Sequence, residues 1–224
     1  MIPWEKLDTA IVPGTDGELR LMRRGAEFSI MLGTNELMNS RLSGSEAALA
    51  TLAARKIEAV AKPHVLIGGL GMGFTLRAAL AVLGADARVV VAELVPAVVG
   101  WARGPMAKIF GDSLKDTRVD IREADVTEII RSHRSTFDAI LLDVDNGPEG
   151  LTRQANDALY SSSGLKVAHT ALRSGGVLAV WSSGPDLSFA KRLDQAGFDV
   201  NEVRVRATGR GGGARHIIWI ATKD

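Results

Sequence analysis

The sequence contains no cysteine among its 224 residues. This absence excludes a disulfide scaffold, a thiolate metal site and a cysteine nucleophile. An excess of charge of one sign is also lacking, because 27 Lys and Arg against 26 Asp and Glu leave a formal net charge of +1. A balance this close to zero gives no sign of a nucleic-acid or membrane partner.

Long apolar runs are missing as well. The longest, residues 89–102, is interrupted by Glu93, Pro96 and Gly100 and is too short to cross a membrane. The first residues carry no basic stretch followed by an apolar one, so the sequence predicts no signal peptide and a cytoplasmic location. The four histidines do not have the spacing of metal ligands, and no metal site is predicted.

From residue 62 onward, short apolar runs alternate with helical stretches. Such alternation predicts a parallel sheet covered by helices on both faces. The last two apolar runs have no helix between them, so they must pair as an antiparallel hairpin. The predicted strands cover residues 64–67, 88–92, 119–123, 137–142, 176–181, 198–205 and 216–222, and the predicted helices cover residues 74–83, 96–103, 126–133, 164–172 and 186–196.

The predicted fold class is α/β: a Rossmann-like, doubly wound sheet of seven mostly parallel strands with a C-terminal antiparallel hairpin strand, formed by residues 63–224. Residues 1–62 are predicted to be a small appendage, with a β-hairpin of residues 18–22 and 27–32 and a helix over residues 46–60. Ser43 and Glu46 have the spacing of a capping box at the start of that helix. The appendage is too small to be stable alone and would suit a homodimer.

Polar residues stand where the buried runs of the sheet end. A glycine cluster over residues 68–73 follows the first strand, and Glu93, Asp125 and Asp143 follow the next three. Ligands of open parallel sheets bind at this carboxyl edge, where the strand order reverses. Any one of these acids alone would be explained as a helix N-cap or a turn residue, but their recurrence at one edge predicts a binding site.

The spacing of the glycines distinguishes between ligands. The cluster contains neither the G-x-G-x-x-G of a dinucleotide site nor the Gly-Lys-Ser/Thr of a phosphate loop. What remains is G-x-G-x-G, and Glu93 at the next strand end can accept hydrogen bonds from both hydroxyls of a ribose. Asp125 is then placed to accept from an adenine amine. The pattern therefore predicts a ligand with ribose and adenine but no pyrophosphate, such as S-adenosylmethionine.

Four stretches of this edge resemble the spermidine synthase-like branch of the class I S-adenosylmethionine-dependent methyltransferase superfamily. They are VLIGGLGMG, VVVAELV, READV and FDAILLDVDNGP, and the resemblance covers residues 63–181 and, more weakly, the N-terminal hairpin and helix. It implies that the donor is held by Gly69, Gly71 and Gly73 at its methionine portion, by Glu93 with the adjacent Leu94 at its ribose, by Asp125 with Val126 at its adenine, and by Asp143 at the mouth between donor and acceptor.

The sequence departs from the aminopropyltransferases of that branch. Their glycine loop carries an acid, as G-G-G-D-G-G, whereas residues 70–72 here are Leu-Gly-Met. Their two acids follow at D-x-x-D spacing, whereas Asp143 and Asp145 are one residue closer, and the chain has a single tyrosine, Tyr160. On these departures we predict a methyltransferase acting on a small molecule. The alternatives are a polyamine aminopropyltransferase using decarboxylated S-adenosylmethionine and a non-catalytic nucleoside-binding protein.

Transfer from a sulfonium needs an acceptor that is positioned and unprotonated at its attacking atom. Asp143 and Asp145 are the predicted catalytic residues, because they can bind an ammonium or accept its proton. The appendage should fold over the site, which makes part of it a candidate for contact with the acceptor. The candidate substrate residues are Glu36, Asn39, Arg41 and Glu46 from the appendage and Trp181 at the end of the fifth strand.

Overall fold

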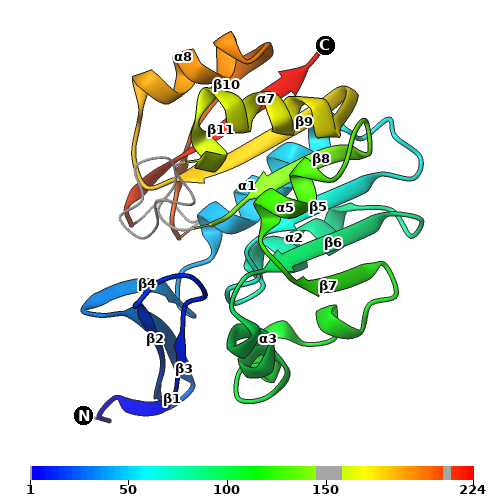
Figure 1. Ribbon diagram of the computed structural model, residues 1–224. Coiled ribbons are helices and arrows are strands. Elements are labelled where there is room, and N and C mark those ends of the chain that lie inside the picture. Colours follow the sequence, from blue (N-terminus) through cyan, green and yellow to red (C-terminus); the bar gives the residue numbers. More distant parts are fainter. Residues whose placement is uncertain (1, 145–157, 209–212) are drawn as a thin grey trace.

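Figure 1 shows the computed structural model of the protein, which describes residues 2–144, 158–208 and 213–224. The chain forms two sheets, a four-stranded one at the N-terminus and a seven-stranded one that carries the helices. The strands of the larger sheet are β5 (His64–Gly68), β6 (Arg88–Glu93), β7 (Val119–Glu123), β8 (Phe137–Leu142), β9 (Leu172–Ser182), β10 (Phe198–Arg206) and β11 (Arg215–Lys223).

The seven-stranded sheet has the order β10-β11-β9-β8-β5-β6-β7. The five strands from β5 to β9 are parallel, and β11 is antiparallel to both of its neighbours. The predicted fold class is therefore confirmed, including the C-terminal hairpin. The strand order reverses at β5, whose neighbours are β6 on one side and β8 on the other, so the carboxyl ends of these three strands flank the switch point.

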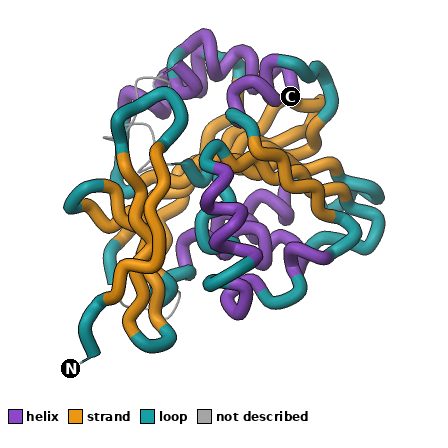
Figure 2. Tube along the Cα trace, turned by 60° about the horizontal axis from the view of Figure 1, so that its bottom comes forward, coloured by secondary structure: helices purple, strands orange, loops and turns teal. Residues whose placement is uncertain are grey.

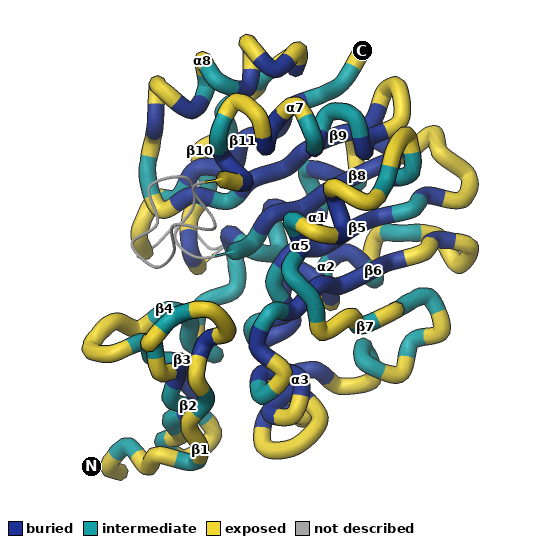
Figure 3. Tube along the Cα trace, in the orientation of Figure 1, coloured by how far each residue is buried: buried dark blue, intermediate teal, exposed yellow. Residues whose placement is uncertain are grey.

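Alternating residues of the central strands feed two hydrophobic clusters, one on each face of the sheet. On β5, Val65 and Ile67 belong to one cluster and Leu66 to the other. Figure 3 shows the resulting run of buried residues along the central strands. The first face is covered by α1 (Gly44–Lys56), α2 (Phe74–Val82) and α3 (Pro96–Arg103), and the second by α5 (Val126–Arg131), α7 (Ser162–Ala171) and α8 (Leu187–Gln195). The short helices α4 (Ala107–Phe110) and η1 (Ser113–Lys115) follow α3.

The N-terminal sheet contains two strands beyond the predicted hairpin. Its order is β1 (Glu5–Ile11), β2 (Glu18–Arg24), β3 (Glu27–Leu32) and β4 (Asn35–Asn39), all antiparallel. Both additional strands are at the edges, where backbone pairing does not require an apolar pattern. The sequence EKLDTAI of β1 has no buried residue, and NELMN of β4 begins and ends with asparagine. Figure 2 shows this sheet standing beside the main body of the protein.

The N-terminal sheet shares the hydrophobic core of the larger one. Leu21 and Ile30 of the small sheet lie in the same buried cluster as Val98 of α3. The indole N–H of Trp101 on α3 donates a hydrogen bond of 2.6 Å to the carboxylate of Asp8 on β1. These contacts hold the small sheet against the carboxyl edge of the large sheet.

The helix α1 begins at Gly44 and ends at Lys56, so it is shorter at its C-terminal end than predicted. It packs against α2 and β9. Ser43 occupies the N-cap position but forms no side-chain capping bond, so the predicted capping box is wrong. Glu46 instead takes a hydrogen bond from Ser45, at 2.8 Å. In the described part of the chain, no helix is both long and apolar enough to span a membrane.

Candidate active site

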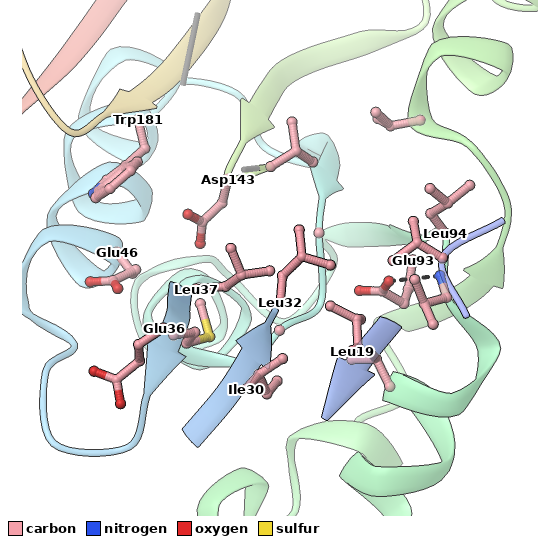
Figure 4. A pocket seen from close by; sticks show the side chains of 18 of the residues that line it. Leu19, Ile30, Leu32, Glu36, Leu37, Glu46, Glu93, Leu94, Asp143 and Trp181 are labelled. Carbon is pink, nitrogen blue, oxygen red and sulfur yellow. Dashed lines mark hydrogen bonds between the residues drawn. The ribbon is translucent and has the colours of Figure 1, made fainter. Parts of the chain in front are cut away.

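A cavity of about 490 Å³ lies between the N-terminal sheet and the carboxyl ends of β5, β6, β8 and β9. One of its walls is apolar and comes from the small sheet, with Leu19, Ile30 and Leu32. The opposite wall carries the polar residues of the strand ends. Figure 4 shows Asp143 and Glu46 near Trp181 in one part of the cavity and Glu93 beside Leu94 in another.

Most of the predicted site residues meet in this cavity, although they come from seven separate segments of the chain. Asp145 lies outside the described residues. Gly73 and Arg41 do not line the cavity. The predicted residues that do line it are Glu36, Asn39, Glu46, Gly69, Gly71, Glu93, Leu94, Asp125, Val126, Asp143 and Trp181.

Glu93 is the last residue of β6, and it is 7% exposed. Its carboxylate accepts hydrogen bonds from the backbone N–H of Leu70, at 3.0 Å, and of Val95, at 2.9 Å. Burial raises the pKa of Glu93, and the backbone hydrogen bonds oppose that rise. The side chain thus fixes the glycine turn to the end of β6 and holds a carboxylate against the cavity.

Asp125 has both of the roles considered for it. It is the N-cap of α5, and its carboxylate accepts the backbone N–H of Thr127 at 2.8 Å. It also lines the cavity together with Val126. Since this bond uses only Oδ1, the other oxygen of Asp125 is left for a ligand amine.

Gly69 must be a glycine for a packing reason. Its φ is +91°, and a Cβ built on it would lie 2.5 Å from the backbone oxygen of Asp143. Its N–H donates to the carbonyl of Ala92 on β6, at 2.9 Å. The missing side chain therefore lets the turn after β5 pass close to the ends of both neighbouring strands, where a ligand can approach the backbone.

We expect Gly69→Ala to destabilise the protein by about 2–4 kcal/mol. Alanine is strained in the left-handed backbone conformation, and its Cβ would clash with the backbone of Asp143. The matched control is Gly84→Ala, since a Cβ at Gly84 would meet no atom within 4 Å. Urea unfolding of the two variants measures the difference. Equal stabilities would show that the close approach at Gly69 is not a constraint.

Two predicted residues have other contacts. Gly73 precedes α2 with φ +74°, and a Cβ there would lie 2.3 Å from the ring of Phe110, so this glycine makes room for an aromatic core residue. Arg41 forms ion pairs with Glu27, at 3.2 Å, and Glu36, at 3.6 Å. These partners hold its guanidinium in a surface groove of the N-terminal sheet.

Asp143 follows β8, and its carboxylate accepts the hydroxyl of Thr75 at 2.6 Å. Burial and the negative charge of Glu46 raise the pKa of Asp143 to about 7, and the bond from Thr75 partly offsets them. Burial also raises the pKa of Glu46. The cavity therefore contains two carboxyl groups whose charges repel one another, and the carboxyl group of Asp143 ionises near neutral pH.

Trp181 ends the apolar part of β9 and is in edge-on contact with His216 of β11, at 4.7 Å between ring centroids. Its indole nitrogen is buried and has no hydrogen-bond partner. The imidazole of His216 reaches the hydroxyl of Ser45 at 2.9 Å. Burial lowers the pKa of His216.

Three polar residues of the site were missed as candidates from the sequence. Thr75 is the second residue of the largely apolar helix α2, next to the glycine turn and therefore close to the strand ends. Ser45 is hidden in a pattern that suggests helix capping. His216 begins a strand and is 171 positions away from its partner Ser45, so only the fold brings the two together.

No protein-family model matches the chain. The polyamine aminopropyltransferase 1 of Streptomyces coelicolor is 31% identical over 157 residues, which is 66% of this chain and 29% of that protein. The chain thus spans less than a third of the length of this relative. Among solved structures, the spermidine synthase of Thermotoga maritima matches 98% of this chain and 73% of its own, with a TM-score of 0.74 and 19% identity.

Two further solved structures are similar. A spermidine synthase in complex with the transition-state analogue AdoDATO matches 98% of this chain and 72% of its own, with a TM-score of 0.73 and 18% identity. A probable spermidine synthase from Corynebacterium glutamicum matches 97% and 79%, with a TM-score of 0.67 and 18% identity.

The prediction of a methyltransferase acting on a small molecule is wrong. It is overturned by these similarities, which are to aminopropyltransferases and spermidine synthases. It depended on the missing acid of the glycine loop and on the closer spacing of Asp143 and Asp145. Leu70 in that loop is 4% exposed and Met72 is fully buried, so both residues pack in the core. Their identity therefore does not indicate whether a methyl or an aminopropyl group is transferred. The chain has the fold of the spermidine synthases, and the resemblance that its motifs predict to the spermidine synthase-like branch is confirmed.

Proposed function

We propose that the protein is an aminopropyltransferase that moves the aminopropyl group of decarboxylated S-adenosylmethionine to an amine. The observation that supports it best is one cavity with Glu93 where the ribose of a donor would lie and with Asp143 and Glu46 beside an aromatic side chain elsewhere (Figure 4). The sequence similarity to a polyamine aminopropyltransferase supports the same reaction.

The residues at β6 and β7 fit the donor. A buried carboxylate, Glu93, is available to the two ribose hydroxyls, and Asp125 keeps one carboxylate oxygen for the adenine amine. The wall opposite them is formed by Leu19 and Ile30 of the N-terminal sheet. An apolar wall of this kind excludes water from a nucleoside and offers its flat base a surface to pack on.

The residues at the ends of β8 and β9 and at the start of α1 fit an amine. Asp143 and Glu46 offer two carboxyl groups, and Trp181 offers an aromatic ring at the same part of the cavity. An ammonium group is attracted by carboxylates through charge-assisted hydrogen bonds and by an indole face through its quadrupole. Glu36 belongs to the same lining, but its carboxylate is bonded to Ser29 and Asn39, so it contributes less to this end.

The sulfonium of the donor supplies an activated carbon, which leaves the protein the tasks of positioning and proton removal. The nitrogen of the amine forms a bond to the aminopropyl carbon that is attached to sulfur, the bond between that carbon and sulfur breaks, and methylthioadenosine leaves with the electron pair. The nitrogen must first lose a proton. Asp143 is the base we assign, because a pKa of about 7 lets its carboxylate take a proton near neutral pH.

The proposal is tested by supplying purified protein with decarboxylated S-adenosylmethionine and 1,4-diaminobutane or spermidine and measuring methylthioadenosine. We expect release of methylthioadenosine that requires both donor and amine. Intact S-adenosylmethionine should give no methylated amine. Binding of the donor without release of methylthioadenosine with any amine would contradict an aminopropyltransferase and favour a nucleoside-binding protein.

A further inference from the structure

We propose that Ser45 and His216 are positioning residues that hold Glu46 as an ionised carboxylate, through a chain of hydrogen bonds from the His216 ring to the Ser45 hydroxyl to the Glu46 side chain. The role of Glu46 in turnover, which is to bind the ammonium of the amine, rests on the proposed function. The positions of the protons in this chain of hydrogen bonds do not depend on that function.

The geometry of this chain is close and enclosed. Ser45 is completely buried, and its hydroxyl oxygen lies 2.8 Å from Oε2 of Glu46 and 2.9 Å from Nδ1 of His216. The His216 ring is fixed from its other side by Trp181, whose plane makes an angle of 67° with it. Ser45 and Glu46 come from the first turn of α1 and His216 from the start of β11. Two elements thus bring these three side chains together at the cavity wall.

The hydroxyl of Ser45 has a single hydrogen, which fixes the direction of the whole chain. If Glu46 is ionised, it can only accept, so Ser45 donates to it and His216 must donate to Ser45 from a protonated Nδ1. If Glu46 carries a proton, it donates to Ser45, which then donates to an unprotonated Nδ1. The charge of Glu46 and the tautomer of neutral His216 are therefore coupled.

The groups around Glu46 act on its charge in opposite directions. The titratable groups that face it are His216 from β11 and Asp143 from the end of β8, and Glu36 of β4 lines the same cavity. Arg206 and Arg215 flank this part of the β10–β11 hairpin but are exposed. Burial and Asp143 disfavour the charge on Glu46, and the bond from Ser45 supports it, so losing that bond should weaken ammonium binding.

The tautomer of His216 is the direct test, measured by the nitrogen chemical shifts of the imidazole in the purified protein at pH 7.5 without donor or amine. We expect the ring to carry its proton on Nδ1. In Glu46→Ala the hydroxyl of Ser45 is free to donate to the ring, so the proton should move to Nε2. Glu36→Ala is the matched control and should leave the tautomer unchanged, because its carboxylate is bonded to Ser29 and Asn39. A parent ring protonated on Nε2 would overturn the inference.

The kinetic test uses two replacements of His216. In His216→Gln the side-chain amide can still donate to Ser45, whereas in His216→Phe the ring keeps its packing on Trp181 but has no donor. We expect His216→Phe to raise KM for the amine about tenfold with little change in KM for the donor. In His216→Gln, KM for the amine should stay close to the value of the parent protein. Equal effects of the two replacements would contradict a positioning role. If no methylthioadenosine forms at all, the proposed function fails, while the tautomer still decides the inference.

Discussion

Glu93→Ala should weaken binding of decarboxylated S-adenosylmethionine by at least about 100-fold. The variant loses the carboxylate that, in the proposed site, would accept hydrogen bonds from both ribose hydroxyls, and each hydrogen bond to a charged group contributes about 1.5–3 kcal/mol. It also frees the N–H groups of Leu70 and Val95, which the carboxylate now holds at 3.0 and 2.9 Å. The glycine turn that should surround the donor then loses its attachment to β6.

Glu123→Ala is the matched control for this experiment. Glu123 lies directly opposite Glu93 in the pairing of β6 with β7 and is exposed. Calorimetric titration with the donor compares the two variants with the parent, and thermal unfolding shows whether Glu93→Ala is folded at the temperature of the titration. A folded Glu93→Ala protein that binds the donor as tightly as the parent would show that the donor does not lie at the end of β6.

Asp143→Asn should lower kcat by about 100- to 1,000-fold, because the variant cannot take a proton from the amine. In the parent, we expect the rate to rise with pH through about 7, where the carboxyl of Asp143 ionises. The asparagine variant should lack that rise. Asp120→Asn is the control, since Asp120 is an exposed residue of β7 that pairs with Arg122. An unchanged pH profile in Asp143→Asn would assign the proton to another group.

The same substitution should stabilise the protein at high pH. A carboxyl whose pKa rises on folding from its usual 3.8 to about 7 keeps its proton in the folded state at a pH where the unfolded chain has lost it. Stability therefore falls as the pH rises between these two values, and the loss is complete above pH 7. Asp143→Asn should have a higher Tm than the parent at pH 8, with a smaller gain at pH 5. A lower Tm at both values would mean that the loss of activity reports misfolding.

A substitution of Thr75 should change the pKa of Asp143. Its hydroxyl donates to Asp143 at 2.6 Å and lowers the pKa of that carboxyl. In Thr75→Val the pKa should rise further, and the rise of the rate with pH should move to a higher pH. A profile that stays in place would show that Asp143 does not control the rate.

The main sheet was predictable because its strands are buried on both faces and its helices alternate with them. Such strands are continuous apolar runs, such as residues 137–142, whose predicted bounds agree with β8. The edge strands β1 and β4 were not predictable in this way. They are held by backbone pairing to β2 and β3, and only part of their side chains contact the core.

The candidate site was also predictable only in part. Glu93, Asp125 and Asp143 were found because each lies at or within two residues of the end of a recognisable strand, and parallel strands bring their carboxyl ends to one edge. Other contacts of the site join distant segments of the chain: Ser45 with His216, and Met38 with Gly71. No local pattern encodes such a pair. Leu70 illustrates the converse error, since an absent acid was given a chemical meaning when the position is occupied by a core residue.

In the proposed reaction, one cavity binds a nucleoside donor at Glu93 with its sulfonium directed to Asp143 and Glu46. Calorimetric titration with decarboxylated and intact S-adenosylmethionine tests it most directly, because the two differ only in a carboxylate that would approach these two acids. We expect the decarboxylated donor to bind at least about tenfold more tightly, since like charges in a buried site repel. Tighter binding of the intact molecule would contradict an aminopropyl transfer site and show that the cavity recognises the carboxylate.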